Sequence, residues 1–350
     1  MRALRPLSFL SNKIMVTALL LSVMLLATAN SEADDAVSDV LGKAYDMYAL
    51  TDFDVAIKSA EALLERTDLM PRDSIAIFEF LGVCNYAKGT EHHNKAFSYL
   101  NRIASVGPCL NPLPQNFWPK QLCNRWYSLM KSKEILNCAA EDSGVKTIAF
   151  LPFDNYSVGK YQEKLGLLSH ALAEFFAHDF GKVSSLRVIE RNKMDYLLEE
   201  IKLSKEGITS QSAAVKVGKM LGAQLMVFGT ISQIDDRHAR MVAKVVKVET
   251  SEIIASVDRE GRPDFNSMEK ALVAELAAKL DSELSEDSKN KLKYGGSDSF
   301  DALYHYSLGL EYMDLYDYKN AYDNFKKAYD MDNKFIEAKQ KMNIYRPLVG

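Results

Sequence analysis

"GAQLMVFGTISQIDDRHARMVAKVVKVETSEIIA", residues 222–255, is the stretch that decides the fold of the central part of this chain. Two apolar runs lie on either side of a polar turn of four residues, Asp235 to His238. Apolar runs joined by a short polar turn are typical of a β-hairpin. We expect a further strand at "SEIIASV" and, before the hairpin, a helix that Ser210 caps and Gly222 ends.

Strands and helices alternate on both sides of this hairpin. The short apolar runs "VKTIAFLPF" and "SLRVIER" predict two further strands. A long helix is predicted after the first strand, because apolar residues recur there at helical spacing. These residues are Leu165, Leu168, Leu172, Phe175, Phe176 and Phe180. We therefore expect residues 144–284 to form an α/β domain, with helices covering a mixed sheet, inside a multidomain α+β protein.

No sequence motif for nucleotide binding or catalysis stands out. The first predicted strand is followed by "DNYSVGKYQEK", which holds one glycine where a dinucleotide-binding loop needs three. The motifs G-x-S-x-G, H-E-x-x-H and G-x-x-x-x-G-K-[ST] do not occur in the chain. We expect a protein that is not an enzyme and that uses no cofactor.

The amino terminus has the pattern of an export signal. Arg2, Arg5 and Lys13 precede an apolar run over residues 14–26, which ends in the small-x-small sequence that closes at Ala29. This pattern predicts a signal peptide over residues 1–29, cleaved after Ala29. The alternative is a membrane anchor, but a spanning helix needs roughly 20 apolar residues. No cysteine follows the run, so we do not expect a lipoprotein.

The overall charge disfavours nucleic acid as a partner. The composition, with 47% hydrophobic and 26% charged residues, is that of ordinary folded protein. Removal of the three basic residues of the signal changes the formal net charge from -4 to -7. An acidic chain does not attract a phosphate backbone.

The four cysteines lie together in the amino-terminal half of the chain. Cys84, Cys109, Cys123 and Cys138 fall within 55 residues, which in an oxidising compartment suggests one or two disulfides. The alternative is a set of buried thiols. A metal site is not expected, because no C-x-x-C or C-x-x-H spacing occurs. His170 and His178, eight residues apart, are also too far apart to share an ion and are expected to be surface histidines.

Residues 36–140 are predicted to form paired helices. Gly42 and Ala56 are 14 residues apart, as are Gly82 and Ala96, and the two units repeat with a period of 40. We expect the small residues to lie where two antiparallel helices touch. The pattern resembles the tetratricopeptide repeat (TPR), with a turn two residues longer than is usual in that family.

A single helical hairpin is predicted at the carboxyl terminus, over residues 300–345. The polar stretch 285–299, which contains Gly295 and Gly296, is expected to be a linker before it. Six residues of the hairpin match the tetratricopeptide consensus: Leu308, Gly309, Tyr312, Ala321, Phe325 and Ala328. An isolated repeat must dock on the amino-terminal repeats, on the central domain or on another subunit. Its many tyrosines suit either a recognition surface or internal packing.

Four motifs of the central region resemble, in their order, those of the curli-assembly CsgG family. They are "IAFLPFDNYS", "VIERNKMDYLLEE", "KMLGAQLMVFGTIS" and "VVKVETSEIIAS". The family is similar in turn to the amino-terminal domain of the translocation protein TolB. The resemblance implies a periplasmic α/β domain that works through protein contacts and has no catalytic residues. The matching positions are Phe153, Asn155, Glu190, Arg191, Gly222, Ala223 and Gly229.

Glu190 and Arg191 form the family's Glu-Arg step, at the predicted junction of a strand and a helix. We expect a salt bridge that sets this turn; the alternative is a binding role.

The chain departs from this family at the connections between strands. The best-known member lines an outer-membrane barrel with two extra hairpins per subunit. Here the turn from Asp235 to His238 and the stretch "VDREGRPDFNSMEKAL" leave no residues for such hairpins. Placing Arg240, Lys244 or Lys247 at mid-membrane would cost about 2 to 4 kcal/mol each. We therefore expect a relative of a channel component that lacks the channel wall.

The sequence thus predicts a non-enzymatic adaptor or assembly factor in the periplasm of a Gram-negative-type bacterium. We expect envelope proteins as partners and peripheral association with the outer membrane. One alternative is a homo-oligomeric ring that joins a secretion channel whose barrel comes from another protein. Another alternative is a regulator of cell-wall synthesis.

Overall fold

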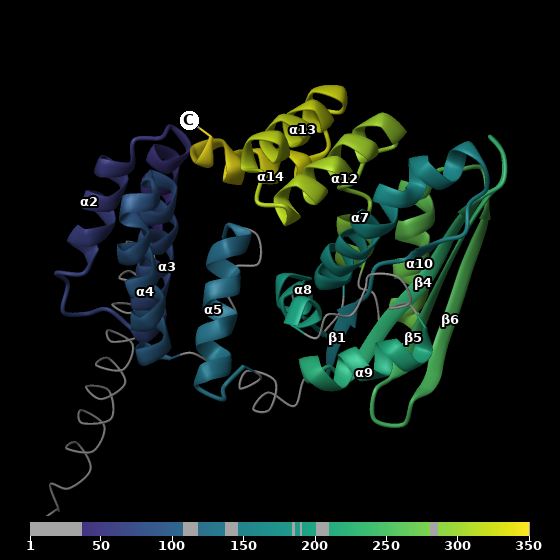
Figure 1. Ribbon diagram of the computed structural model, residues 1–350, viewed down its shortest axis with the longest axis horizontal. Helices are drawn as coiled ribbons and strands as arrows, with labels where there is room; N and C mark the ends of the chain where they lie inside the picture. The colour runs from purple at the N-terminus through teal and green to yellow at the C-terminus, as the bar shows by residue number, and fades with distance from the viewer. Residues whose placement is uncertain are drawn as a thin grey trace, which may run out of the picture.

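The chain folds into three units that pack side by side (Figure 1). The computed structural model describes residues 37–107, 118–136, 146–183, 186–189, 191–200, 210–280 and 286–349. An amino-terminal helical unit and a central α/β domain lie at the two ends, and the carboxyl-terminal helices lie against both. Ala29, Cys109, Cys138 and Glu190 lie outside the described residues, so the predictions made for them stay predictions.

The amino-terminal unit is helical, as predicted. A helix over residues 37–49 is followed by α2 (Phe53–Leu63), α3 (Pro71–Lys88), η1 (Thr90–His92), α4 (His93–Val106) and α5 (Lys120–Ser132). Cys84 and Cys123 are buried in this unit, and no disulfide joins the two. Burial raises the pKa of the Cys84 thiol, as expected for the buried-thiol alternative.

The expected contact of the small residues with a neighbouring helix holds at Gly82 and is wrong at Gly42, while Gly309 of the carboxyl-terminal hairpin shows a much closer approach. A Cβ atom at Gly309 would lie 2.5 Å from Cε1 of Phe325, so the two helices of the carboxyl-terminal hairpin approach too closely for a side chain. A Cβ atom at Gly82 would make ordinary contacts with the Ala96 carbonyl and Tyr99. Gly42 faces open space, so close packing does not explain its position.

The central sheet is mixed, as predicted. Its order is β3-β1-β4-β5-β6, and a short strand, β2, also pairs with β4. The pairs of β4 with β1 and β2 and of β1 with β3 are parallel, whereas β4, β5 and β6 are antiparallel. The strands are β1 (Thr147–Phe150), β2 (Asp154–Asn155), β3 (Arg187–Val188), β4 (Leu225–Gln233), β5 (Ala239–Lys247) and β6 (Glu252–Gly261).

Helices cover both faces of this sheet (Figure 1). On one face lie α7 (Lys160–Val183) and α10 (Phe265–Lys279), and on the other lie α8 (Arg191–Glu200) and α9 (Gln211–Leu221). As predicted, the Ser210 hydroxyl accepts a hydrogen bond from the backbone N–H of Ala213 and caps α9. The helix ends at Gly222, whose φ of 67° lies in the left-handed region that favours glycine.

The sheet separates two hydrophobic cores, and each terminal unit extends one of them. Met226 on β4 belongs to the core shared with α8, α9 and the amino-terminal helices. Val227, the next residue, belongs to the core shared with α7, α10 and the carboxyl-terminal helices. Alternate residues of one strand therefore serve the two terminal units.

The carboxyl-terminal unit packs on the central domain of the same chain. Its helices are α11 (Glu286–Leu292), α12 (Phe300–Asp314), α13 (Tyr318–Met331) and α14 (Ile336–Tyr345), followed by η2 (Arg346–Leu348). Helix α12 lies along α7, and buried Tyr306 stacks on Phe175. The stretch 285–299, predicted as a linker, contains α11 and is more ordered than its polar composition suggested.

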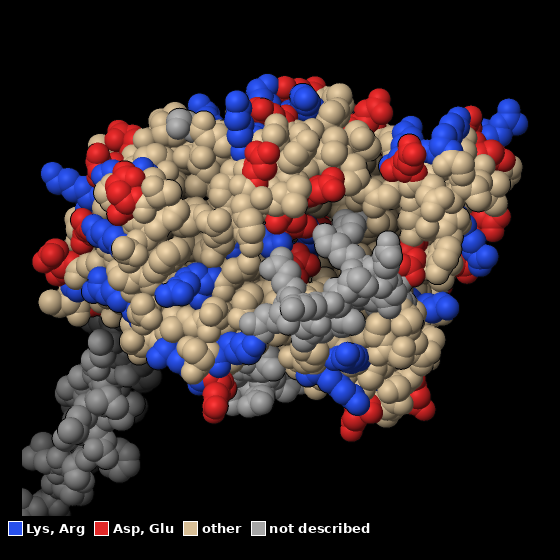
Figure 2. All heavy atoms as spheres, viewed as in Figure 1, with Lys and Arg blue, Asp and Glu red and all other residues tan. Residues whose placement is uncertain are grey.

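The surface carries both signs of charge. Figure 2 shows Lys and Arg side chains interspersed with Asp and Glu over the face in view. Among the described residues, no helix is both long and apolar enough to span a membrane.

Candidate functional site

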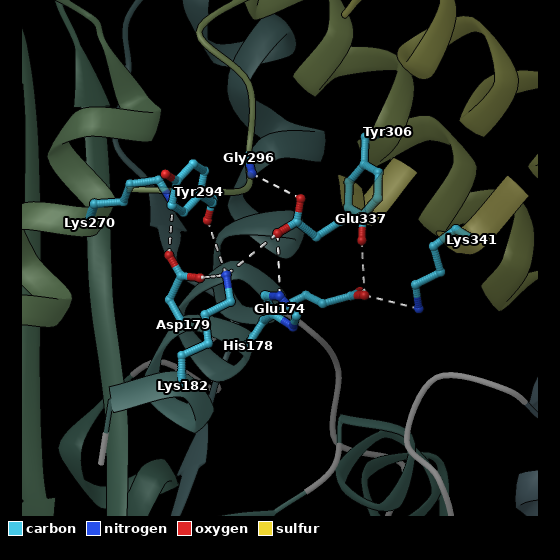
Figure 3. Close-up of polar contacts among 10 residues, drawn as sticks. All are labelled: Glu174, His178, Asp179, Lys182, Lys270, Tyr294, Gly296, Tyr306, Glu337 and Lys341. Atoms are coloured by element: carbon cyan, nitrogen blue, oxygen red, sulfur yellow. Dashed lines mark hydrogen bonds and ion pairs between the residues drawn. The ribbon is translucent and has the colours of Figure 1, made fainter. Parts of the chain in front are cut away.

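A cluster of partly buried charged residues lies where the carboxyl-terminal unit meets the central domain. Helix α7 presents Glu174, His178 and Lys182 at intervals of four residues, which places them on one side of the helix. Helix α14 presents Glu337 and Lys341 at the same interval. Figure 3 shows that the two sets face each other, with Lys341 beside Glu174 and Glu337 beside His178 and Lys182.

Glu174 receives contacts from three other helices. Its Oε1 lies 3.0 Å from Nζ of Lys341 and accepts a hydrogen bond of 3.1 Å from the Tyr306 hydroxyl. Its Oε2 lies 3.2 Å from Nη1 of Arg191. Burial by itself raises the pKa of Glu174, but Lys341 and Arg191 outweigh that effect, so the pKa is lowered. Glu174 is therefore a largely buried carboxylate, with a side chain 17% exposed, that stays ionised.

Arg191 connects this carboxylate to two other acids. The residue begins α8, shortly after the short strand β3, and its side chain is 14% exposed. Nη2 lies 2.6 Å from Asp314 at the end of α12, and Nε lies 3.3 Å from Asp195 one turn further along α8. Burial lowers the pKa of Arg191, but Asp314, Asp195 and Glu174 together raise it. The guanidinium therefore stays charged.

The same network reaches the amino-terminal unit. Oδ1 of Asp314 lies 3.4 Å from Nζ of Lys120, which opens α5 and is buried. Nearby, the Asn124 side-chain amide donates a hydrogen bond of 2.9 Å to the Tyr316 hydroxyl. A chain of opposite charges thus runs from α14 through α7, α8 and α12 to α5. We call Lys341, Glu174, Arg191, Asp195, Asp314 and Lys120 the junction network.

A second group of charges lies further along α7 (Figure 3). The buried carboxylate of Asp179 lies 2.6 Å from Nζ of Lys182 and 2.9 Å from Nζ of Lys270 on α10. Lys182 also donates a hydrogen bond to the Tyr294 carbonyl. Glu337 accepts a hydrogen bond of 2.9 Å from the backbone N–H of Gly296. The segment between α11 and α12 is thereby fixed to α7 and α14.

Glu269, on α10, is a buried acid in the same region. Burial raises its pKa well above the ordinary value, and the neighbouring charge of Asp179 raises it further, while Lys270 and Lys182 oppose the shift. Its Oε1 has no hydrogen-bond partner among the residues that the structure describes. Glu269 is therefore expected to stay protonated over a range of pH in which an exposed glutamate is ionised.

One set of residues in this group has donor atoms close enough to hold a metal ion. Atoms of His178, Asp179 and Glu337 all lie within 4.8 Å of one another. Nζ of Lys182, however, already lies 2.6 Å from Asp179 and 3.9 Å from Glu337. The ammonium group of Lys182 is thus the cation between the carboxylates of Asp179 and Glu337. The geometry is that of an ion-pair cluster.

The cavity at the junction is small. It measures about 80 Å³ and is lined by residues of both groups, among them Glu174, Arg191 and Glu337. Pockets for small molecules usually measure about 300 to 1,000 Å³. The junction therefore has room for water-sized molecules and is suited to holding helices together.

The structure places the predicted family-motif positions in different parts of the central domain. A Cβ atom at Gly229 would lie 2.1 Å from the Val242 carbonyl and 2.5 Å from the Phe153 ring, so these strands require a glycine there. Asn155 organises the turn after β2, where its Oδ1 accepts from the N–H of Ser157. Gly222 and buried Ala223 end α9. Of the described motif positions, Arg191 alone belongs to the junction.

The salt bridge expected to set the turn at Glu190 and Arg191 involves Glu190, which lies outside the described residues, so it stays a prediction. Among the described residues, Arg191 pairs with acids of α7, α8 and α12. His178 is also not a simple surface residue, because it lies partly buried, 3.4 Å from Glu337.

The tetratricopeptide consensus residues build the carboxyl-terminal hairpin itself. Ala321, Phe325 and Ala328 are fully buried, and Gly309 packs against Phe325. Leu308 and Tyr312 are partly buried. These positions support the predicted helical hairpin, while the assignment to that repeat family stays a prediction.

Several residues of the junction were missed by the sequence analysis: Lys120, Glu174, Asp314, Glu337 and Lys341. One signal was present. Glu174 interrupts the apolar stripe of α7 next to Phe175, and a charged residue within such a stripe requires a partner when it is buried.

Comparisons with known proteins support the predicted resemblance. Residues 136–243 match the family described as "Curli production assembly/transport component CsgG". Two solved structures that the chain resembles are the LpoB C-terminal domains from Salmonella enterica and Escherichia coli. For the first, identity is 12%, the TM-score is 0.23, and the match covers 42% of this chain and 97% of that chain. For the second, the values are 15%, 0.24, 42% and 96%.

At these TM-scores, neither structure bears on the fold or the function of this chain. No curated protein matches the sequence.

Proposed function

We propose, from the premise that the central domain matches the CsgG family, that this chain is a non-enzymatic assembly factor of the bacterial cell envelope. In this proposal the α/β domain is a platform on which the two helical units are held in a fixed arrangement. Partner proteins bind the exposed surfaces of these units. The chain acts by holding partners together and carries out no chemical reaction.

The observation that carries the proposal is that Arg191 and the partly buried acids around it pair with one another and with other charges of the chain. Arg191, Glu174 and Asp314 each face an opposite charge from another helix, Asp195 pairs with Arg191 on the same helix, and five helices of the three units contribute. A catalytic acid or base has to meet its substrate in a cleft. Here the charges face one another around a cavity of about 80 Å³, an arrangement that favours a structural role.

The family match supports the cellular setting. The family is described as a component of curli production, assembly and transport. Together with the export signal expected over residues 1–29, this description supports a periplasmic chain of a Gram-negative-type bacterium, peripherally associated with the outer membrane.

Cell fractionation combined with crosslinking tests the proposal. The full chain, tagged at its carboxyl terminus, is produced in a Gram-negative host, and the first residue of the purified protein is determined. We expect a chain that begins at Asn30, is found in the envelope fraction and is released from membranes by high salt. In the source bacterium, crosslinking of intact cells is expected to give discrete adducts with envelope proteins.

Two results would contradict the proposal. One is an uncleaved chain in the cytoplasm. The other is a chain that stays with the membrane after carbonate washing, which indicates integral insertion. Light scattering of the purified chain separates the proposal from the oligomeric ring, because a closed ring gives one large, discrete mass.

A further inference from the structure

A second and larger cavity lies at one end of the central sheet. It measures about 720 Å³ and shares no lining residue with the junction cavity. Its walls come from the start of β4, the ends of α9, β5 and α10, and the beginning of β6. A volume of this size falls within the range of about 300 to 1,000 Å³ that is usual for ligand pockets.

One of the apolar side chains that line the cavity, Ile254, lies at a β-bulge. Ala223, Leu225 and Val248 are buried beneath the cavity. Strand β6 has a bulge: Val246 pairs with Ile253 and Val245 pairs with Ala255, so Ile254 has no opposite residue on β5. A β-bulge bends its strand and changes the direction in which the side chains at the bulge point. Ile254 lines the cavity and is 45% exposed, which leaves apolar surface available for a ligand.

The rim of the cavity is basic. Lys146, Lys219, Lys247 and Lys279 line it, and Glu249 is the one acid among the lining residues. Lys247 pairs with exposed Glu249 at 3.2 Å, and Lys279 pairs with Glu275 at 3.4 Å. Within the part of the chain that the structure describes, Lys146 and Lys219 have no ion-pair partner. A local excess of positive charge is notable in a chain whose formal net charge is -4.

We propose that this cavity binds an acidic peptide segment of a partner protein. The carboxylates of the peptide would lie against the lysines of the rim, and an apolar side chain of the peptide would pack on Ile254. Charge complementarity selects the acidic partner. The site is concave, and its lysines come from α9, β5, α10 and the residue before β1, whereas a membrane surface is best met by a convex or flat basic face. The inference does not depend on where in the cell the chain works.

Fluorescence anisotropy with synthetic peptides tests this inference. The probes are labelled hexapeptides from a library that alternates Asp or Glu with Leu or Phe, and the protein is the full mature chain. We expect saturable binding by members of the library, weakened by added salt. Lys219→Glu should weaken binding by about tenfold or more, which corresponds to the loss of one favourable charge contact and the gain of a repulsive one.

Matched control variants are available on the same elements. Lys216 lies on α9, one turn before Lys219, and is exposed outside the cavity lining. Lys216→Glu changes the net charge by the same amount and should leave the affinity within about twofold. Ile254→Ala should weaken binding, whereas Ile253→Ala, at the exposed neighbour outside the lining, should not. Circular dichroism of each variant checks that it folds.

Four results would overturn the inference. The first is the absence of saturable binding across the library. The second is equal weakening by Lys216→Glu and Lys219→Glu, which indicates a diffuse charge effect. The third is binding to phosphatidylglycerol vesicles that depends on Lys219 and that the peptides compete for, which assigns the site to a membrane. The fourth is a doubled mass by light scattering that Lys219→Glu abolishes, which assigns it to a second copy. None of these results alters the predictions for the junction.

Discussion

The guanidinium of Arg191 lies 2.6 Å from the carboxylate of Asp314, which stands 123 residues further along the chain. Arg191 begins a helix of the central domain, and Asp314 ends the first long helix of the carboxyl-terminal hairpin. The ion pair is largely shielded from solvent, with side chains 14% and 13% exposed, and is extended by Glu174 on one side and Lys120 on the other. The carboxyl-terminal hairpin therefore docks on its own chain, which was one of the three possibilities that the sequence left open.

Replacement of Arg191 is expected to destabilise the whole protein. Arg191→Met leaves the carboxylates of Glu174, Asp195 and Asp314 close together without their shared cation. Removal of one partner of a buried ion pair typically costs about 3 to 5 kcal/mol. The free energy of unfolding, measured in urea, should fall by that amount. Arg240→Met, which removes an exposed pair with Asp258, should cost less than about 1 kcal/mol. Equal effects of the two substitutions would show that Arg191 is not buried in a network.

The contributions of Glu174 and Lys341 to the free energy of unfolding should be coupled. A double-mutant cycle with Glu174→Gln and Lys341→Met is expected to give a coupling energy of about 1 to 3 kcal/mol, because the two groups are in direct contact and largely shielded from solvent. The control cycle uses Lys326 and Asp330, an exposed pair on α13, and should give a value near zero. A Glu174 cycle that also gives zero would mean that α14 does not lie on α7 in solution.

The buried acid Glu269 should make stability depend on pH. Its pKa is raised in the folded chain, so the folded state binds more protons than the unfolded state does. The free energy of unfolding should therefore fall as the pH rises from the ordinary glutamate pKa through the raised value. Glu269→Gln should flatten this slope and stabilise the protein at the upper end of that range.

The pH experiment has a control on the same helix. The pKa of Glu275 is lowered, first of all by a hydrogen bond from Arg259, so Glu275→Gln should leave the slope from Glu269 in place. An unchanged pH dependence of unfolding in Glu269→Gln would refute the assignment of this slope to Glu269.

Two glycines should respond to alanine in opposite directions. In Gly309→Ala the new methyl group would meet the fully buried ring of Phe325, and overpacking of this kind costs about 1 to 3 kcal/mol. In Gly42→Ala the methyl group would meet open space within a helix, so the higher helix propensity of alanine should stabilise the protein by about 0.5 to 1 kcal/mol. Thermal unfolding of both variants measures the effects, and a stabilised Gly309→Ala would contradict the close helix contact.

The sequence was informative where local periodicity or capping sets the structure. The apolar stripe of α7, the turn after Gln233 and the cap at Ser210 each depend on residues close together in the chain, and all three were predicted. Strand β2 has two residues, too few for any periodic signal. Helix α11 lies in a polar stretch that was predicted as a linker.

The junction was not predictable in the same way. Glu174 and Lys341 are 167 residues apart, and charged residues at helical spacing usually face solvent. Only the docking of α14 on α7 brings these two charges together and shields them from most of the solvent. The family motif drew attention to Arg191 but gave no information about Asp314, which lies in another unit.

The central claim, that the carboxyl-terminal unit docks in cis on the central domain, can be tested by cutting the chain between them. A protease site is placed within residues 281–285, the purified protein is cleaved, and its native mass is measured by light scattering during gel filtration. We expect the two fragments to co-elute with the mass of one intact chain, and Arg191→Met to weaken this association. Fragments that separate after cleavage, or an intact protein that is already a dimer through exchanged carboxyl-terminal units, would contradict the claim.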